Sequence, residues 1–434
     1  MRPHKADLAF GQNSPDSPLP GEFFVLRRAG KAPFFLRLAL FCFSYTMSET
    51  TCGKGMDESL RWNKRGIAAG VLAFLYAVCL AFPASAKAFS AQGAALMEAQ
   101  SGQLLFGQNE SERLPMASTT KIMTALVAIE NGDPEQLCVV SGHAAGVEGS
   151  SLYLKEGEVY TLAQLLYGLL LRSGNDAATV IAESVGGSEQ AFVDLMNERA
   201  AQMGLENTHF DNPTGLDGDT HYTTARELAM LTACALQNEE FCKYFGARQY
   251  VIGETSTHEG RTLVNKHRLL TLREDVIGGK TGYTKASGRS LVTAARSDGM
   301  TLVAVTINDP NDWADHEELL DWGFESYECV DASKLLRPQR IPLAGGGSLE
   351  ARAAQPVFVA LPKGEKEQLK VTYYLPRFCY GSIGLLQELG KASVTLQGEE
   401  VVSLPMVCWR KDVPQKAKRG IWELITDAIC TILK

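Results

Sequence analysis

Three short motifs contain side chains that could act together on an acyl group. They are Ser118-Thr119-Thr120-Lys121, Ser173-Gly174-Asn175 and Lys280-Thr281-Gly282. Each motif alone occurs by chance in many chains, so the indication comes from finding all three in this order. A serine hydroxyl is a weak nucleophile at neutral pH and needs a nearby base to take its proton. The set therefore predicts acyl transfer through a serine, and we expect neither a metal ion nor a cofactor.

Ser118 and Lys121 are the predicted nucleophile and its base. Residues i and i+3 share a helix face, so a helix beginning at Ser118 would place the Lys121 amine beside the hydroxyl. A lysine acts as a base only when it is neutral. Burial and the charge of Lys280 should both lower the pKa of Lys121 from its usual value of about 10.4. We expect Lys280 to stay permanently charged and to bind a substrate carboxylate.

The second motif is predicted to move protons and to orient the base. The hydroxyl of Ser173 can donate and accept, so it could relay a proton from Lys121 to a leaving amine. The amide of Asn175 could donate to a substrate amide and also hold Lys121 in place.

The third motif is predicted to bind the substrate. Thr281 could donate a hydrogen bond to a terminal carboxylate, and Gly282 would let a substrate backbone lie close to a strand edge. The backbone N–H groups of Ser118 and Tyr283 are the expected donors to an oxyanion.

The surrounding pattern predicts a domain of mixed α and β structure over residues 87–329. Strand patterns cover residues 93–106 and 290–307, the second around an Asp298-Gly299 hairpin signal. Helical periodicity follows Ser118, and Thr161 with Gln164 forms a capping box before an apolar helix that ends at Ser173-Gly174-Asn175. A further helix is expected over residues 312–327.

The sequence pattern changes after Cys329. Short β-type runs separated by turns predict a small all-β domain over residues 330–412. Residues 413–434 then place apolar side chains on one helix face behind Lys416, Lys418 and Arg419. This helix of about 15 residues is too short to span a bilayer. We favour its lying on the membrane surface, with packing on its own β domain as the alternative.

Residues 1–86 are expected to be an upstream extension followed by a signal peptide. A basic flank precedes an apolar run at residues 67–82, and small residues end at Ala86. We favour cleavage after Ala86, with an uncleaved anchor as the alternative. Because the signal begins far from Met1, we predict that translation starts at Met47 or Met56. The protein should therefore be secreted across the cytoplasmic membrane and attached to its outer face.

The composition excludes several classes of protein. With 45% hydrophobic and 21% charged residues, the 434-residue chain can bury a core and is not intrinsically disordered. A net charge of −8 argues against a nucleic-acid partner. Cysteine spacing fits no metal site. Cys234 with Cys242, or Cys379 with Cys408, could form a disulfide, and free thiols are the equal alternative.

From about residue 94 to 327 the sequence resembles a low-molecular-weight penicillin-binding protein, a serine-type D-Ala-D-Ala carboxypeptidase. Residues 115–124, 171–178 and 279–284 are similar to the three motif segments of that family. Further similar segments are residues 207–216, 222–229, 361–364 and 389–392, and the tail is similar to the family's amphipathic anchor.

The resemblance implies a fold and a reaction. The fold would be the penicillin-binding/β-lactamase-like α+β type, an antiparallel sheet with a helical subdomain, followed by the small β domain and the amphipathic helix. The reaction would be removal of the terminal D-Ala from peptidoglycan stem pentapeptides through an acyl-enzyme on Ser118. β-Lactams would be inhibitors that acylate the same serine.

One segment departs from the family pattern. The family commonly has Asn-x-Asn before a Leu-Leu pair, whereas this chain has Asn265-Lys266-His267-Arg268-Leu269-Leu270. Lys266 could supply a second cation near the carboxylate. For His267 we expect a polar position on a solvated loop.

Three alternative functions remain open. A β-lactamase of the commonest type needs a Glu-x-x-Leu-Asn pattern between the second and third motifs, which this chain lacks. A D,D-transpeptidase or endopeptidase would use the same motifs, so sequence does not separate it from a carboxypeptidase. A non-enzymatic wall-binding module is disfavoured because all three motifs are intact.

Overall fold

The computed structural model describes residues 89–344, 346–380 and 383–412. The predicted extension, signal peptide and C-terminal helix lie outside these ranges. Within them, no helix combines the length and the apolar character needed to cross a membrane. We call residues 89–329 the α+β region and residues 330–412 the β region; the predicted domain boundaries stay predictions.

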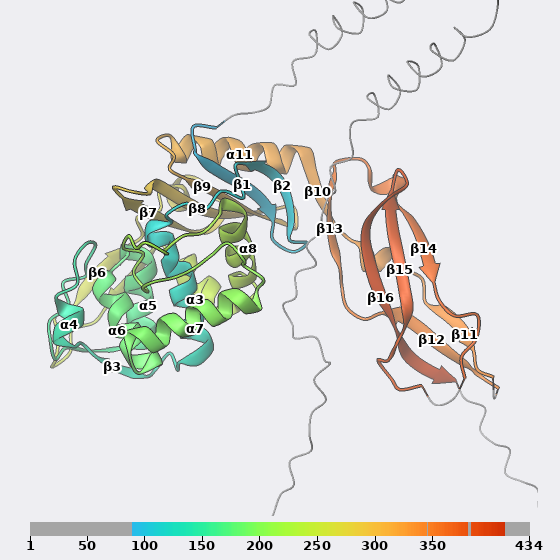
Figure 1. Cartoon of the computed structure of the whole chain (residues 1–434), viewed down its shortest axis with the longest axis horizontal. Helices are drawn as coiled ribbons and strands as arrows, with labels where there is room; N and C mark the ends of the chain where they lie inside the picture. The colour runs from blue at the N-terminus through green and yellow to red at the C-terminus, as the bar shows by residue number, and fades with distance from the viewer. Residues whose placement is uncertain (1–88, 345, 381–382, 413–434) are drawn as a thin grey trace, which may run out of the picture. The chain divides into compact units, whose positions relative to one another are not determined.

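A five-stranded antiparallel sheet forms the centre of the α+β region (Figure 1). Its strand order is β2-β1-β9-β8-β7, so the N-terminal strand β1 pairs with β9 from much later in the chain. The predicted Asp298-Gly299 hairpin is confirmed, with both residues at positive φ between β8 and β9. The strands are β1 Gly93–Glu98, β2 Gln103–Gln108, β7 Val276–Thr284, β8 Gly288–Ser297 and β9 Met300–Ile307.

Both faces of this sheet are covered, which explains why every residue of β9 is buried. Val303 and Val305 belong to the core shared with the helical subdomain, whereas Leu302 and Ala304 belong to the core that contains Leu319. Leu319 lies on α11, Asp312–Ser326, which lies on the opposite side of the sheet from α8 in Figure 1. The alternation follows the two-residue period of a strand.

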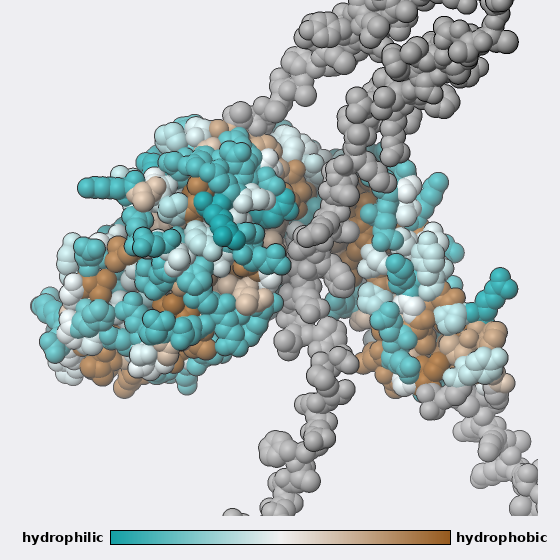
Figure 2. All heavy atoms as spheres, viewed as in Figure 1, coloured by the Kyte–Doolittle hydropathy of each residue, from teal (hydrophilic) through white to brown (hydrophobic). Residues whose placement is uncertain are grey.

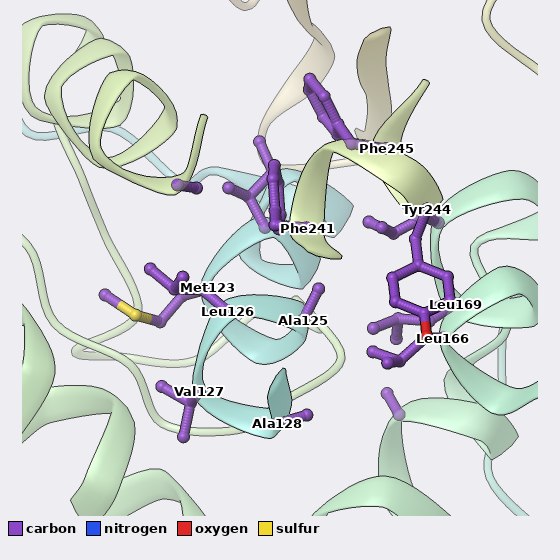
Figure 3. Close-up of a cluster of buried hydrophobic side chains, with 14 of the residues drawn as sticks. Met123, Ala125, Leu126, Val127, Ala128, Leu166, Leu169, Phe241, Tyr244 and Phe245 are labelled. Carbon is purple, nitrogen blue, oxygen red and sulfur yellow. The ribbon is translucent and has the colours of Figure 1, made fainter. Parts of the chain in front are cut away.

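The helical subdomain packs around α3, Lys121–Asn131 (Figure 3). Met123, Leu126 and Val127 of α3 are fully buried, and Phe241 with Tyr244 of α9 packs in the same core. The other helices are α4 Gly142–Ala145, α5 Leu162–Tyr167, α6 Asn175–Gly186, α7 Glu189–Gln202, α8 Ala225–Ala235, α9 Glu239–Phe245 and α10 Leu269–Leu272. Two small strand pairs flank them, β3 Leu137–Val139 with β4 Val159–Thr161, and β5 Gln249–Ile252 with β6 Arg261–Val264.

Two helix predictions hold with changes of detail. The capping box between Thr161 and Gln164 is present at the start of α5. The same helix continues as a wider π-type turn, η3 Gly168–Arg172, and ends at Ser173 in a left-handed conformation. Ser118 lies in a 3₁₀ turn, η2 Ala117–Thr120, so the regular helix begins at Lys121 rather than at Ser118.

The β region contains a second five-stranded antiparallel sheet, of order β11-β12-β16-β15-β14. The short β-type runs of the sequence, residues 357–361, 369–374 and 392–396, overlap β13 Phe358–Pro362, β14 Lys370–Tyr374 and β15 Glu388–Leu396. Apolar side chains form two small cores, one around Val394 and Leu404 and one around Ala392 and Met406. The elements are β10 Tyr327–Asp331, η4 Ala332–Leu335, β11 Gln339–Pro342, β12 Ser348–Ala353, β13 Phe358–Pro362, η5 Lys366–Gln368, β14 Lys370–Tyr374, β15 Glu388–Leu396 and β16 Glu399–Asp412.

Neither candidate cysteine pair forms a disulfide in the structure, and the thiols of Cys234, Cys242, Cys379 and Cys408 are all free. Burial raises the pKa of Cys234 and of Cys242, which disfavours their reactive thiolate forms.

Candidate functional site

The nucleophile segment is a tight turn fixed by its own threonines. Ala117 has a positive φ of 48°, and the turn leads directly into α3. The hydroxyl of Thr119 donates to the Met116 carbonyl at 2.6 Å, and that of Thr120 donates to the Ala117 carbonyl at 2.8 Å. Because both hydroxyls are buried, these bonds satisfy carbonyls that water cannot reach. The two middle residues of the motif therefore hold the turn that carries Ser118.

Lys121 is fully buried and surrounded by three oxygen atoms. Its Nζ lies 3.1 Å from Ser118 Oγ and 2.7 Å from Asn175 Oδ1, and it also contacts the Thr214 carbonyl oxygen. Burial, followed by the charges of Lys280 and Lys266, holds the pKa of Lys121 well below its usual value. The direction of the shift agrees with the prediction: burial favours the neutral amine relative to an exposed lysine.

Asn175 is oriented at both ends of its amide. Its Oδ1 accepts from Lys121, and its Nδ2 donates to the Glu148 carbonyl at 2.7 Å. One N–H of the amide is therefore already used inside the protein. The donor that sequence reasoning assigned to the substrate can only be the second N–H.

Ser173 projects its hydroxyl toward the second lysine. The residue has φ 64° and ψ 34°, a left-handed conformation that ends the wide turn η3. Its Oγ accepts a hydrogen bond from Lys280 Nζ at 2.9 Å. The structure thus joins Ser173 to Lys280, whereas the predicted relay joined it to Lys121.

Asp176 anchors the second motif, and sequence reasoning missed it. Its buried carboxylate accepts backbone N–H groups of Leu152 at 2.8 Å and Leu154 at 3.1 Å, and the Ser151 hydroxyl at 2.6 Å. The neighbouring N–H of Asn175 donates to the Ser150 carbonyl at 2.7 Å. These bonds tie residues 150–154 to the start of α6. The available signal was an acidic residue, the one charged side chain in the first two turns of that helix.

Lys280 is as deeply buried as Lys121, and this corrects the prediction of a permanently charged side chain. Burial, followed by the charge of Lys266, lowers the pKa of Lys280 to about 7. Near neutral pH its amine and ammonium forms are therefore both populated. Nζ donates to Ser173 Oγ and to the Thr281 carbonyl at 2.7 Å. An anion bound at Nζ would favour the ammonium form.

The rest of the third motif lies along β7, an edge strand of the central sheet. Thr281 is half-buried, and Tyr283 is exposed. A Cβ on Gly282 would lie 3.2 Å from both the Met116 carbonyl oxygen and the Ser118 nitrogen. Gly282 therefore lets β7 approach the nucleophile turn, a structural reason that adds to the predicted approach of a substrate.

Gly215 packs against the same turn from the other side. It has a φ of 82°, and a Cβ there would lie 2.0 Å from the Ala117 carbonyl oxygen. The adjacent Thr214 carbonyl contacts Lys121. The segment around residue 215 therefore completes the wall of the site with backbone atoms.

His267 is buried, and the prediction of a solvated loop position was wrong. Its Nε2 lies 3.0 Å from Thr293 Oγ1, and burial lowers its pKa to about 3. The ring fits because Gly279 lies opposite, where a Cβ would come within 2.3 Å of Nε2. Lys266 is exposed, and its charge lowers the pKa of both site lysines. Its predicted role as a second cation near the carboxylate stays a prediction.

His221 supports the nucleophile turn from behind and was not identified from the sequence. Its Nδ1 accepts the Asp211 backbone N–H at 3.0 Å, and burial lowers its pKa to about 4. The neutral ring must then carry its proton on Nε2, which lies 2.7 Å from Thr120 Oγ1. The chain of bonds continues from Thr120 to the Ala117 carbonyl. An uncharged imidazole thus fixes the turn that presents Ser118.

Six of the eight predicted site residues form two connected groups. Ser118, Lys121 and Asn175 form one hydrogen-bonded set, and Ser173, Lys280 and Thr281 form the other. Gly282 brings the second set against the first, and Tyr283 follows it on the strand. In the described ranges no cluster of three or more His, Cys, Asp or Glu side chains could hold a metal ion.

Comparisons with known proteins show which family the chain resembles. A family model for D-alanyl-D-alanine carboxypeptidases, peptidase family S11, matches residues 81–311. The carboxypeptidase DacF of Bacillus subtilis is 32% identical over 338 residues, which cover 74% of this chain and 86% of DacF. DacB2 of Mycobacterium tuberculosis is 36% identical over 232 residues, 52% of this chain and 79% of DacB2.

Solved structures extend the similarity to both regions. Penicillin-binding protein 5 from Haemophilus influenzae superposes with a TM-score of 0.68 at 26% identity, covering 75% of this chain and 98% of its own. The Streptomyces K15 DD-transpeptidase superposes with a TM-score of 0.53 at 29% identity, covering 55% of this chain and 98% of its own.

Proposed function

This chain belongs to the D-alanyl-D-alanine carboxypeptidase family, and from that premise we propose how its own residues perform the reaction. The family assignment makes it a serine-type hydrolase that removes the terminal D-Ala of peptidoglycan stem peptides, binds penicillin and takes part in peptidoglycan maturation. It acts outside the cytoplasm. The roles of individual residues below are our proposals.

Acylation begins with the neutral amine of Lys121. Two neighbours of its Nζ can only accept hydrogen bonds: the side-chain oxygen Oδ1 of Asn175 and the backbone carbonyl oxygen of Thr214. A neutral amine has two N–H groups for them, which leaves its lone pair for the third neighbour, the Ser118 hydroxyl. Lys121 then takes the Ser118 proton as Oγ attacks the carbonyl carbon of the penultimate D-Ala. This arrangement is the single observation that carries the proposal.

The second hydrogen-bonded set delivers a proton to the leaving group. As the C–N bond breaks, the leaving amine of the terminal D-Ala needs a proton. Ser173 can give its hydroxyl proton and regain one from the Lys280 ammonium, 2.9 Å away. Before deacylation, Lys121 gives the proton it took from Ser118 to solvent, and Lys280 regains a proton from solvent. Water then attacks the ester on Ser118 while Lys121 takes a proton from the water. Lys121 returns that proton to Ser118 Oγ as the ester bond breaks, which restores the free serine.

Substrate binding uses the edge of β7 and the site cations. Lys280 and the hydroxyl of Thr281 would hold the terminal carboxylate, and Lys266 adds positive charge nearby. The backbone N–H groups of Ser118 and Tyr283 would bind the oxyanion. Gly282 keeps the two donors close because it lets β7 lie against the turn.

We also propose how the protein reaches its place of action. Residues 1–86 would contain the secretion signal, with its apolar run at residues 67–82. Residues 413–434 would attach the protein to the outer face of the cytoplasmic membrane as an amphipathic helix.

Covalent labelling with penicillin tests the assignment of Ser118. The wild-type protein should gain the mass of one opened penicillin, and the Ser118→Ala variant should gain none. Ser111→Ala, which removes the hydroxyl of an exposed serine outside the site, is the matched control and should still be labelled. Labelling of the Ser118→Ala variant would refute the assignment.

Transpeptidation is the second candidate, because the K15 DD-transpeptidase shares the fold of the α+β region. A stem pentapeptide offered together with an acceptor amine separates the two reactions. A carboxypeptidase should release D-Ala and leave the tetrapeptide as the main product, whereas a transpeptidase should form the amide with the acceptor. Turnover of the penicillin adduct measures any β-lactamase activity in the same experiment.

A further inference from the structure

The β region exposes large apolar side chains at one end of its sheet. In Figure 2 brown, hydrophobic surface gathers at the end of the β region toward which the β16 arrow points in Figure 1. Five large side chains of this part of the β region are between 48% and 73% exposed. We define the end patch as Phe378, Tyr380, Leu385, Leu386 and Trp409.

Strand topology brings these five side chains to the same end. The segment that leaves β14 crosses to the far edge of the sheet, where Cys379 bridges Leu343 just beyond β11. It then returns beside β16, where the Leu386 N–H donates to the Cys408 carbonyl at 2.8 Å. Trp409 is the next residue of β16. The rings of Phe378 and Tyr380 contact each other edge to face, with centroids 5.0 Å apart.

The local backbone turns these apolar side chains outward. Cys379 is buried in the small core with Met406 and Cys408, so its two aromatic neighbours in sequence point away from that core. An outward position between strands would normally carry a polar residue. Leu386 has a φ of 62°, a left-handed conformation that is unfavourable for leucine, and its side chain is still 66% exposed. The protein therefore keeps a strained backbone that presents an apolar side chain to its surroundings.

The charges around the end patch favour an anionic partner. Arg377, Arg410 and Lys411 flank it in sequence, and the Arg352 guanidinium lies 5.8 Å from the Trp409 ring centroid. Three acidic residues are near: Glu350, which pairs with Arg352 at 2.6 Å, Glu388 at the start of β15, and Asp412, which follows Lys411 in sequence. The four basic residues outnumber these three, so the flanking charge is net positive.

The position of the chain end favours a lipid surface as that partner. β16 ends at Asp412, and 22 further residues follow from this same end of the sheet. They include Lys416, Lys418 and Arg419 and an amphipathic pattern. Tyrosine and tryptophan beside basic residues are typical of the boundary between lipid headgroups and acyl chains. We propose that the end patch itself contacts an anionic lipid bilayer, as a second attachment beside the C-terminal segment.

This proposal rests on the extracytoplasmic location of the proposed function but not on its chemistry. The end patch belongs to the β region, whereas the penicillin-reactive residues belong to the α+β region. Penicillin labelling of every variant therefore reports whether the proposed function fails, independently of lipid binding.

Binding of the secreted chain to vesicles tests the proposal. The vesicles contain phosphatidylcholine and phosphatidylglycerol, and the partition coefficient is measured by sedimentation. The double substitution Leu385→Ser with Leu386→Ser should lower the coefficient by about tenfold or more, because two leucines lose their insertion into lipid. The matched control is Leu137→Ser with Val139→Ser on β3, whose side chains are 69% and 59% exposed, and it should bind like wild type. An unchanged coefficient for the end-patch variant would overturn the proposal.

Two further measurements distinguish other occupants of the end patch. In the background of Ile425→Ser with Ile429→Ser, which weakens the C-terminal segment, the end-patch substitutions should still lower the partition coefficient. If their effect disappears there, the patch holds the C-terminal segment rather than lipid, and the proposal is wrong. It is also wrong if sedimentation without vesicles shows a wild-type dimer that the end-patch substitutions convert to monomer.

Discussion

The two described regions of the molecule treat buried polar groups in opposite ways. The α+β region buries two lysines, several histidines and many threonines, most of them hydrogen-bonded to other buried groups. In the described part of the β region, Ser393 is the buried polar side chain, and its Oγ donates to Glu400 at 2.5 Å. The rest of its core consists of apolar side chains on alternating strand positions.

This difference shows that the α+β region is the part of the fold in which reactive groups are buried at the expense of stability. Burying an amine lowers its pKa and makes it a usable base, but the same desolvation weakens the folded state. The β region carries no comparable cost within the described residues. Substitutions of polar core residues should therefore change the reaction in the α+β region, whereas substitutions of core residues in the β region should change stability alone.

The largest expected effect comes from replacing the buried base. Lys121→Met keeps most of the side-chain volume but removes the amine, so the rate of penicillin acylation should fall by about 10³-fold. The melting temperature should change little, because the lost hydrogen bonds are offset by no longer burying an ionisable group. Stopped-time labelling followed by mass spectrometry measures the rate. Lys155→Met on an exposed side chain is the control, and a wild-type rate for Lys121→Met would exclude Lys121 as the base.

At Asp176 we expect a smaller effect on acylation than at Lys121, but a larger effect on stability. Asp176→Asn replaces one carboxylate oxygen with an NH2 group, which cannot accept the hydrogen bonds that the carboxylate receives. This change should lower the free energy of unfolding by about 2–4 kcal/mol. It should also slow acylation by about tenfold, because residues 150–154 support the backbone of Asn175. Denaturant unfolding and penicillin labelling measure the two changes.

The matched substitution in the β region is Leu404→Ala. Truncating this fully buried leucine should lower the free energy of unfolding by about 2–4 kcal/mol, as at Asp176. The acylation rate should stay at the wild-type value. A slowed acylation in Leu404→Ala would contradict the separation between the two regions.

The features that the sequence predicted correctly are those with a local cause. Ser118 and Lys121 lie three residues apart, and the capping box at Thr161 and the hairpin at Asp298 depend on neighbouring residues. The family resemblance connected the three motifs to each other. The spacing of residues within a helix or a turn is visible in the sequence, so these elements could be predicted from it.

The features that were missed depend on contacts between distant segments. The Thr214 carbonyl contacts Lys121 through a backbone atom, which no residue type reveals. His267 is buried because Gly279 and Thr293, from two later strands, provide its space and its hydrogen bond. Lys280 was expected to stay charged because its burial could not be seen from its motif.

The smallest expected effect is a shift in the pH dependence of kcat/KM. The acid and alkaline sides of this profile report on Lys121 and Lys280 separately. Acylation should need neutral Lys121 and charged Lys280, so kcat/KM should rise on the acid side and fall on the alkaline side. Because the pKa of Lys280 is about 7, the alkaline fall should begin near neutral pH. Lys280→Arg keeps a positive charge at all accessible pH values and should move that fall to higher pH, at a lower absolute rate because guanidinium is bulkier. A fall that stays near pH 7 in the variant would assign it to another group.

The same substitution should change how stability depends on pH, with a sign that follows from proton binding. In the folded protein Lys280 loses its proton near pH 7, whereas in the unfolded chain it does so near its ordinary value of about 10.4. Between these values the unfolded chain binds more protons, so this residue makes the folded state more stable as the pH rises and less stable as it falls toward 7. Lys280→Arg should remove that part of the slope, which thermal unfolding from pH 7 to 10 measures. An identical slope in both proteins would mean that Lys280 keeps its proton in the folded state throughout this range.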